Sequence, residues 1–188
     1  MNDSPTEAFE HAEHAEHVSH LGDRTLTLVS VTIAILAVFA ATVGSLETLE
    51  TAAAFGDKNH AVLMQSKASD SWAFFQAKSV KQGLYAVAAD QGGAKAQEFA
   101  EKARRYDDEQ KEISKEAKSF EAGSEAALAS SEAHERRHHI LTISVTMLHV
   151  AIAVATIAII IRGQLWPWRA SILLGLLGSA GALYAYLG

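Results

Sequence analysis

The chain has 188 residues and a formal net charge of −6, with 49% hydrophobic and 20% charged residues. This acidity excludes a basic nucleic-acid-binding protein, because such a protein needs a positive surface for phosphate. The charges are also segregated: none of the 22 acidic residues follows Ile140, which excludes one globular core under a charged coat. The absence of Cys excludes disulfides, thiolate zinc sites and cysteine nucleophiles.

Residues 1–24 form a polar tail in which Glu-His-Ala repeats between Glu10 and His20. In a helix, residues three apart are surface neighbours, so pairs of these His side chains can bind a divalent metal weakly, with Glu oxygens beside them. The favoured interpretation is a solvated helix end beside the lipid headgroups. The candidate metal ligands are His11, His14, His17 and His20.

Three segments lack Lys, Arg, Asp and Glu altogether: residues 25–44, 140–161 and 170–188. A helix of this length covers about 30 Å, the thickness of a hydrocarbon core. Many of these residues are β-branched, which favours strands in water. In lipid, however, a lone strand leaves its backbone groups unpaired, so a helix is favoured. We predict an all-α protein with three transmembrane helices, the last two joined by a short turn at residues 162–169. The acidic N-terminal flank argues against a cleaved signal peptide.

The charges that flank the first span indicate its orientation. Arg24 precedes this span, whereas Glu47 and Glu50 follow it. Basic residues stay preferentially on the cytoplasmic side of a membrane. We therefore expect a cytoplasmic N-terminus, with residues 45–139 on the other side.

Residues 45–139 contain no Pro and are rich in Ala, Glu, Lys and Gln, which favour helix. The turn signal Asp90-Gln91-Gly92-Gly93 divides them into two arms of nearly equal length. The pattern predicts a long extramembrane antiparallel helical hairpin, coiled-coil-like, with its turn near residues 90–93. A heptad seam marks the returning arm: Phe99, Ala103, Tyr106, Gln110, Ile113, Ala117, Phe120, Ser124, Ala127, Ser131, His134 and His138.

Large side chains within this region are candidates for an interaction surface. Aromatic residues are frequent among the side chains that dominate protein interfaces, but packing between two arms also uses them. Both interpretations remain open. The candidate interaction residues are Trp72, Phe74, Phe75, Phe99, Tyr106, Ile113 and Phe120.

The predicted spans contain two further features. His149 lies near the middle of the second span, where an ionisable group either handles ions or protons or stays neutral. We favour a neutral imidazole that is hydrogen-bonded to a Ser or Thr on another span, for instance Ser30, Thr32 or Ser179. In the third span, Gly175, Gly178 and Gly181 each begin a small-xxx-small pair, which allows close helix packing in lipid.

One stretch matches the zinc-protease pattern His-Glu-x-x-His: His134-Glu135-Arg136-Arg137-His138. In that pattern two His residues four apart bind zinc and the Glu acts as base. A chance match is favoured, because Arg136 and Arg137 repel a cation and no third-ligand motif follows.

The run from Lys67 to Lys81, KASDSWAFFQAKSVK, resembles the hallmark stretch of a bacterial membrane-protein family known as domain of unknown function 4337. The His/Glu/Ala-rich tail and the segment Arg105-Tyr106-Asp107 are similar to that family as well. The resemblance implies a protein of the bacterial inner (cytoplasmic) membrane with three spans and a helical insert. It implies no activity.

These features lead to one expected function and two alternatives. We expect an integral membrane structural or interaction protein, not an enzyme and without a cofactor, that self-associates or serves as an accessory subunit of a larger membrane assembly. The first alternative is an oligomeric ion or proton channel, or a transporter component, that uses His149 and the His-rich tail. The second is a membrane metalloprotease at His134, Glu135 and His138.

Overall fold

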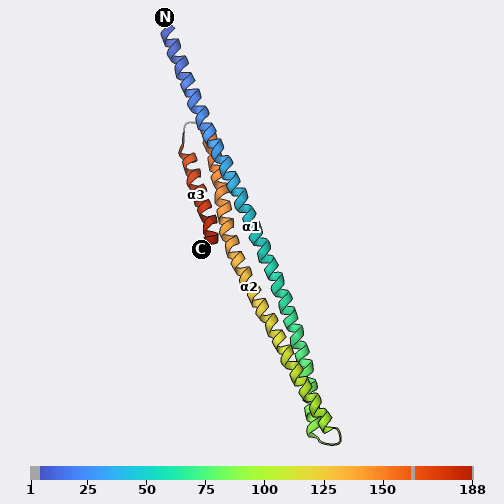
Figure 1. Cartoon of the computed structure of the whole chain (residues 1–188). Coiled ribbons are helices and arrows are strands. Elements are labelled where there is room, and N and C mark those ends of the chain that lie inside the picture. Colours follow the sequence, from blue (N-terminus) through green and yellow to red (C-terminus); the bar gives the residue numbers. More distant parts are fainter. Residues whose placement is uncertain (1–4, 162–163, 188) are drawn as a thin grey trace. The chain divides into compact units, whose positions relative to one another are not determined.

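A computed structural model describes residues 5–161 and 164–187, with side chains from Arg24 onward. It has three helices, α1 (Pro5–Asp90), α2 (Ala96–Ile160) and α3 (Trp166–Leu187), and no strand in the described part of the chain (Figure 1). The predicted all-α class is confirmed. The predicted tail, first span and outgoing arm form one continuous helix: α1 runs through all three, because isolated glycines without Pro do not end a helix.

The chain divides into two compact units. The first unit comprises Met1–Thr51 and Glu135–Gly188, and the second comprises Ala52–His134. α1 and α2 each contribute a segment to both units, whereas α3 belongs to the first alone.

The first unit has an apolar core to which all three helices contribute. All three helices are also long and apolar enough to cross a membrane. Large apolar side chains such as Val38, Ile143 and Leu173 point outward and are more than half exposed. Such a surface is costly in water and suits a hydrocarbon environment. The core residues are Leu36, Ala40, Val43, Leu141, Leu148, Ala151, Ala182 and Ala185.

Glycines of α3 let this helix approach its neighbours closely. A Cβ on Gly175 would overlap Leu36 Cδ2, and a Cβ on Gly178 would lie 2.9 Å from the backbone oxygen of Ser144. A Cβ on Gly181 would lie 2.6 Å from Ser144 Oγ. All three positions are therefore places where a larger side chain forces a neighbour to move, which is the role that small residues have between helices in lipid.

In the second unit, small residues line the contact between α1 and α2. Ser131 Oγ donates to the backbone oxygen of Ala54 at 3.1 Å, and Ser124 Oγ donates to that of Ala61 at 3.0 Å. Both pairs are buried, as is Ala68. As residue numbers rise along α1, the numbers of the residues they contact on α2 fall. The two segments therefore run in opposite directions within this unit. A repeat of seven residues on both helices keeps the small side chains in register.

Aromatic residues line the contact between α1 and α2 towards the connection of the two helices. Tyr85 stacks on Tyr106 with ring centroids 5.7 Å apart, and it lies 5.9 Å from the ring of Phe99. Trp72 meets Phe75 edge-on at 5.4 Å. Such pairs add about 0.5–1.5 kcal/mol beyond the area they bury.

The connection between α1 and α2 is a tight turn. Gly92 and Gly93 have φ angles of +75° and +100°, which favour glycine. The amides of Gln91 and Gly92 donate to the backbone oxygens of Val87 and Ala89, which satisfies two carbonyls at the end of α1.

Candidate functional site

Seven polar side chains gather in the first unit, beyond the end of its apolar core. We refer to them as the polar cluster. α1 supplies three of them, α2 three and α3 one. The members are Glu47, Glu50, Thr51, Arg137, His138, Thr142 and Tyr186.

Glu50 is the most deeply placed member, with 8% of the residue exposed. Arg137 Nε donates to its Oε2 at 3.0 Å, and the hydroxyl of Tyr186 donates to its Oε1 at 3.0 Å. The Arg137 guanidinium also lies 6.0 Å from the centre of the Tyr186 ring. Both carboxylate oxygens are thus hydrogen-bonded, which is what keeps a buried charge tolerable. One carboxylate of α1 thereby holds both α2 and α3.

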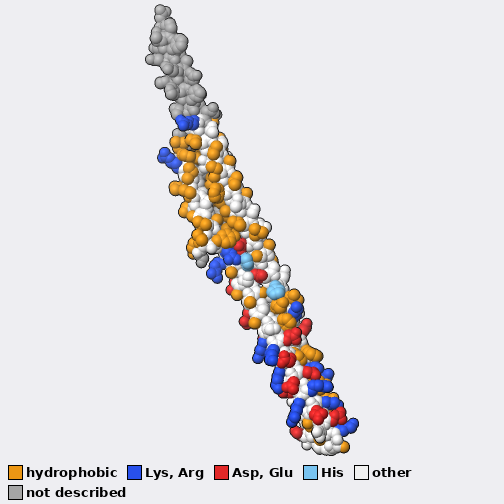
Figure 2. All heavy atoms as spheres, viewed as in Figure 1, with side chains coloured by type: hydrophobic (Ala, Val, Ile, Leu, Met, Phe, Trp, Pro, Cys, Tyr) orange, Lys and Arg blue, Asp and Glu red, His pale blue; other side chains and the backbone are white. Residues whose placement is uncertain are grey.

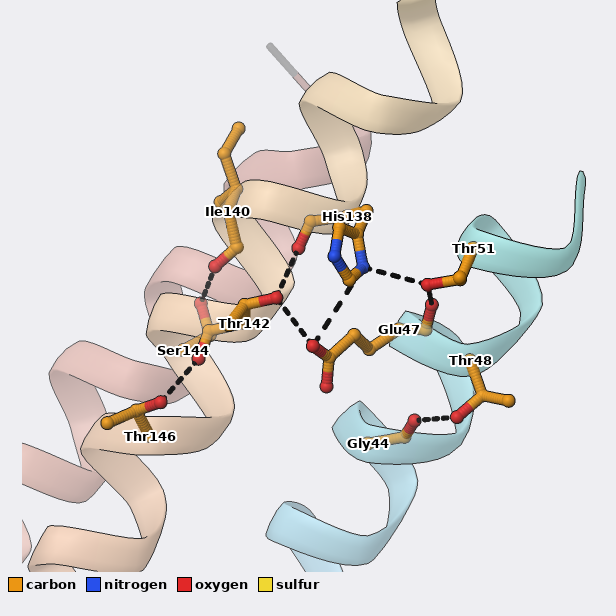
Figure 3. A network of polar contacts seen from close by, with 9 residues as sticks. All are labelled: Gly44, Glu47, Thr48, Thr51, His138, Ile140, Thr142, Ser144 and Thr146. Carbon is orange, nitrogen blue, oxygen red and sulfur yellow. Dashed lines mark hydrogen bonds and ion pairs between the residues drawn. The ribbon is translucent and has the colours of Figure 1, made fainter. Parts of the chain in front are cut away.

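Glu47 and His138 form the second half of the cluster (Figure 3). Thr142 Oγ1 donates to Glu47 Oε1, and His138 Nδ1 lies 3.8 Å from the same oxygen. Thr51 donates to the backbone oxygen of Glu47 at 3.0 Å, and its Oγ1 lies 2.9 Å from His138 Nδ1. The His138 imidazole therefore lies between the Thr51 hydroxyl and the Glu47 carboxylate.

The chemistry of the polar cluster is that of a connector between helices. Its groups are arranged in pairs: one carboxylate accepts a hydrogen bond from a guanidinium, and the other lies beside an imidazole. Because the pairs are partly shielded from solvent, they are screened less than surface pairs. The cluster therefore fixes the register of α1 against α2 and ties α3 to both.

The candidate interaction residues lie in the second unit, and most of them are partly buried between α1 and α2. Ile113 is buried, whereas Phe74 is 53% exposed. Trp72 Nε1 donates to Glu121 Oε1 at 2.8 Å. Phe75, Phe99, Tyr106 and Phe120 have intermediate exposure. Packing between the helices accounts for the buried members, and Phe74 presents its ring outward.

Lys78 joins several of these residues. Its Nζ donates to Glu109 Oε2 at 2.6 Å and lies 5.0 Å from the centre of the Phe74 ring and 5.1 Å from that of Tyr106. This ammonium lowers the pKa of the Glu109 carboxyl, chiefly through the hydrogen bond. Glu98 has a lowered pKa for the same reason, with Lys102 as its donor.

The expected hydrogen bond of His149 is wrong. Thr32 accepts from Trp168 Nε1 at 3.0 Å, and Ser179 donates to the backbone oxygen of Gly175 at 2.9 Å. Ser30 and His149 are both exposed, and His149 has no hydrogen bond to any described residue. The imidazole points away from the core because Leu148 and Ala151 occupy the inward face of α2.

The two groups of candidate metal ligands have different outcomes. The side chains of His11, His14, His17 and His20 lie outside the described residues. His134 Nε2 lies 3.9 Å from Asp57 Oδ2, and His138 belongs to the polar cluster. Among the residues with described side chains, no three His, Asp or Glu are grouped as metal ligands.

Five members of the polar cluster were not predicted as site residues from the sequence: Glu47, Glu50, Thr51, Thr142 and Tyr186. A signal was present: two acidic residues lie three and six positions after one apolar segment, and two basic residues lie three and four positions before the next. Charges at the ends of antiparallel neighbours lie at the same level and pair. Tyr186 had no comparable signal.

Comparison with known proteins gives one match. No curated protein and no solved structure matches the chain. A family model described as Domain of unknown function (DUF4337) matches residues 25–188, which is most of the chain. The resemblance identified in the sequence is thereby confirmed, and the protein belongs to the DUF4337 family.

Proposed function

We propose that this protein is a multi-pass membrane protein with a structural or interaction role rather than a catalytic one. Residues 25–44, 140–161 and 170–188 span the bilayer. Residues 45–139 form an antiparallel helical hairpin outside it and contact other proteins or further copies of the chain. The observation that carries the proposal is the difference between the surfaces of the two units (Figure 2).

The first unit supports membrane insertion through its outward apolar side chains. In water, removing each such side chain from solvent is worth about 1.5–3 kcal/mol, and residues 25–44, 140–161 and 170–188 carry no charged side chain among them, so this surface suits a lipid environment. The second unit supports an aqueous location. Lys111 bridges Asp107 and Asp108 at 2.8 and 3.0 Å, and Lys115 pairs with Glu112 at 2.8 Å. These charged side chains are mostly exposed, which hydrocarbon does not tolerate.

The position of the polar cluster along the sequence supports the same division. Its acidic residues lie three and six positions after Gly44, and its basic residues lie just before Ile140. Charged and aromatic side chains favour the headgroup level of a bilayer, where water and lipid meet. The Arg24 flank supports a location in a cytoplasmic membrane, with the N-terminus in the cytoplasm.

Membrane extraction and labelling test this proposal. The chain has no Cys, so single cysteines report their own surroundings. Lys115→Cys should react with a membrane-impermeant maleimide added from outside the cytoplasm, whereas Leu173→Cys should react only after detergent is added. Alkaline carbonate should leave the protein in the membrane fraction. Release by carbonate, or equal labelling of both cysteines, contradicts the proposal.

A channel or transporter component is the second candidate, and the outward position of His149 favours it. In an assembly of several copies, this imidazole would face a neighbour or a common pathway, because an ionisable group is costly in lipid. The His-rich tail would supply further groups at one end. Proton or cation flux into proteoliposomes tests this candidate. Equal flux for wild type and His149→Leu contradicts a role for His149.

A further inference from the structure

α1 has a second apolar face in the second unit, on the side away from α2. We call it the outer α1 face. Its six large side chains are between 50% and 73% exposed. The members are Phe55, Val62, Leu63, Val80, Leu84 and Val87.

The spacing of this face matches the packing surface of a helix. Ala73, Ala77, Val80, Leu84 and Val87 follow one another in steps of four, three, four and three residues. This is the heptad period, which keeps one stripe in line with a neighbouring helix. All five residues are exposed. The shape therefore suits an α-helix rather than a small molecule or an extended peptide.

The outward face of α2 is different. It carries the ion pairs of Lys111 and Lys115 with acidic residues three or four positions away. Such a face needs no partner to be stable in water, because its charges are hydrated and paired along the same helix. Only the outer α1 face leaves a heptad stripe of apolar residues without cover in the described second unit.

We propose that the outer α1 face binds the same face of a second copy, with the two α1 segments parallel. This inference rests on the proposed function, because the membrane sets the geometry. Copies inserted in one bilayer with the same orientation extend α1 in the same direction. A two-fold axis along the membrane normal then brings identical faces together, the commonest symmetry of homo-oligomers.

The area of the face agrees with a dimer. Six large apolar side chains that bury roughly 100 Å² each give about 600 Å² per copy. A stable interface of standard size buries about 800 Å² per partner. Confinement to one membrane raises the effective concentration, so a slightly smaller area suffices.

The charges along the face permit the same pairing. Between Ala73 and Val87 the residues that flank the stripe carry one charge, Lys81. In a parallel heptad pair, each Lys81 lies opposite Gln76 of the second copy, so no like charges meet there. Lys78 is directed to Glu109 on its own α2.

Asp70 continues the stripe towards Leu63 and is the one acidic residue on it. In a parallel symmetric pair the two Asp70 carboxylates lie opposite each other and repel, as like charges on facing positions do. Asp70→Asn should therefore strengthen the pair. A different partner that offers a basic residue would give the opposite result, since it would lose an ion pair.

Disulfide trapping in the cysteine-free chain tests the proposal. Val80→Cys, Leu84→Cys and Val87→Cys are made singly in the full chain and oxidised in membranes with copper-phenanthroline. A disulfide needs Cα atoms within about 7 Å, so only residues that meet their own copy form it. The control is Lys115→Cys, which is exposed on α2. We expect at least about tenfold more disulfide dimer at the three α1 positions than at the control.

The outcomes separate this inference from the proposed function. Loss of every variant from the membrane fraction overturns the proposed function itself. A second outcome is that the protein stays in the membrane and lysine-reactive reagents link it into oligomers, while Leu84→Cys forms no disulfide dimer. This outcome contradicts pairing through the outer α1 face and leaves the proposed function intact. Weaker association of Asp70→Asn overturns the symmetric pair in favour of a different partner.

Discussion

Glu50 on α1 and Tyr186 on α3 are joined by a hydrogen bond of 3.0 Å between the phenol and Oε1 of a carboxylate that is almost completely buried. The other oxygen of Glu50 accepts from Arg137 on α2. A single side chain therefore connects the three helices of the first unit. The strength of this connection can be measured group by group.

Removal of the Tyr186 hydroxyl should loosen α3. Tyr186→Phe deletes one donor to a buried carboxylate, and hydrogen bonds to charged groups contribute about 1.5–3 kcal/mol. We expect a lower melting temperature in detergent, measured by circular dichroism. Tyr184→Phe is the matched control, because Tyr184 is 63% exposed. Equal melting of both variants contradicts a connecting role for Tyr186.

Glu50 and Arg137 should show strong coupling in a double-mutant cycle. Arg137→Gln removes the guanidinium that faces the buried Glu50 carboxylate, and breaking a buried ion pair costs up to about 3–5 kcal/mol. Glu50→Gln should cost less, because the Arg137 side chain is 32% exposed. The double variant removes both charges, so its loss should be smaller than the sum of the single losses. Denaturant unfolding of the three variants gives the coupling free energy. If the losses of unfolding free energy in the two single variants add up to the loss in the double variant, the two residues are not coupled and this interpretation is wrong.

Gly178→Ala should destabilise the packing of α3. The new methyl would lie 2.9 Å from the backbone oxygen of Ser144 and 3.1 Å from Leu148 Cγ, and backbone yields poorly. Overpacking of this kind costs about 1–3 kcal/mol. Gly56→Ala is the opposite case, since nothing lies within 4 Å of its added Cβ and alanine favours helix by about 0.5–1 kcal/mol. Thermal unfolding should separate the two variants in sign.

Ser124→Ala should weaken the second unit. It removes the buried hydrogen bond between the Ser124 hydroxyl and the backbone oxygen of Ala61, at a cost of about 1 kcal/mol. Ser119→Ala is the control, because the exposed Ser119 bonds only to Glu116 in its own helix. Hydrogen exchange at the amides around Ala61 reports the local change. Equal protection in the two variants contradicts a role for Ser124.

Acid should remove the contribution of the Lys78–Glu109 pair. The folded state lowers the pKa of Glu109 below its ordinary value of 4.5. A carboxyl with a lowered pKa in the folded state stabilises the fold above its unfolded pKa, and this contribution disappears as the pH falls through the folded value. Glu109→Gln should flatten the pH dependence of stability below 4.5 in part, since Glu98 titrates in the same range. The effect is small because the pair is open to solvent. An unchanged slope in circular dichroism melts contradicts this assignment.

Much of the helical architecture was accessible from residue patterns. Long stretches without charge and without Pro predicted long helices, since such stretches satisfy every backbone group internally. The heptad seam also marked the buried side of α2: Ala103, Gln110, Ile113, Ala117, Ser124, Ala127 and Ser131 are all buried. The resemblance around Trp72 identified the family.

The chain therefore determined by itself which segments are helical and which side of α2 is turned inward, because both follow from local periodicity. Only the tertiary structure decided which residues meet across helices. It placed Tyr186 on Glu50 and turned His149 outward, away from Ser30, Thr32 and Ser179. The physical reason is that a helical period defines a face but does not say which neighbour covers it. That depends on how closely the small residues of α3, such as Gly178, let the backbones approach.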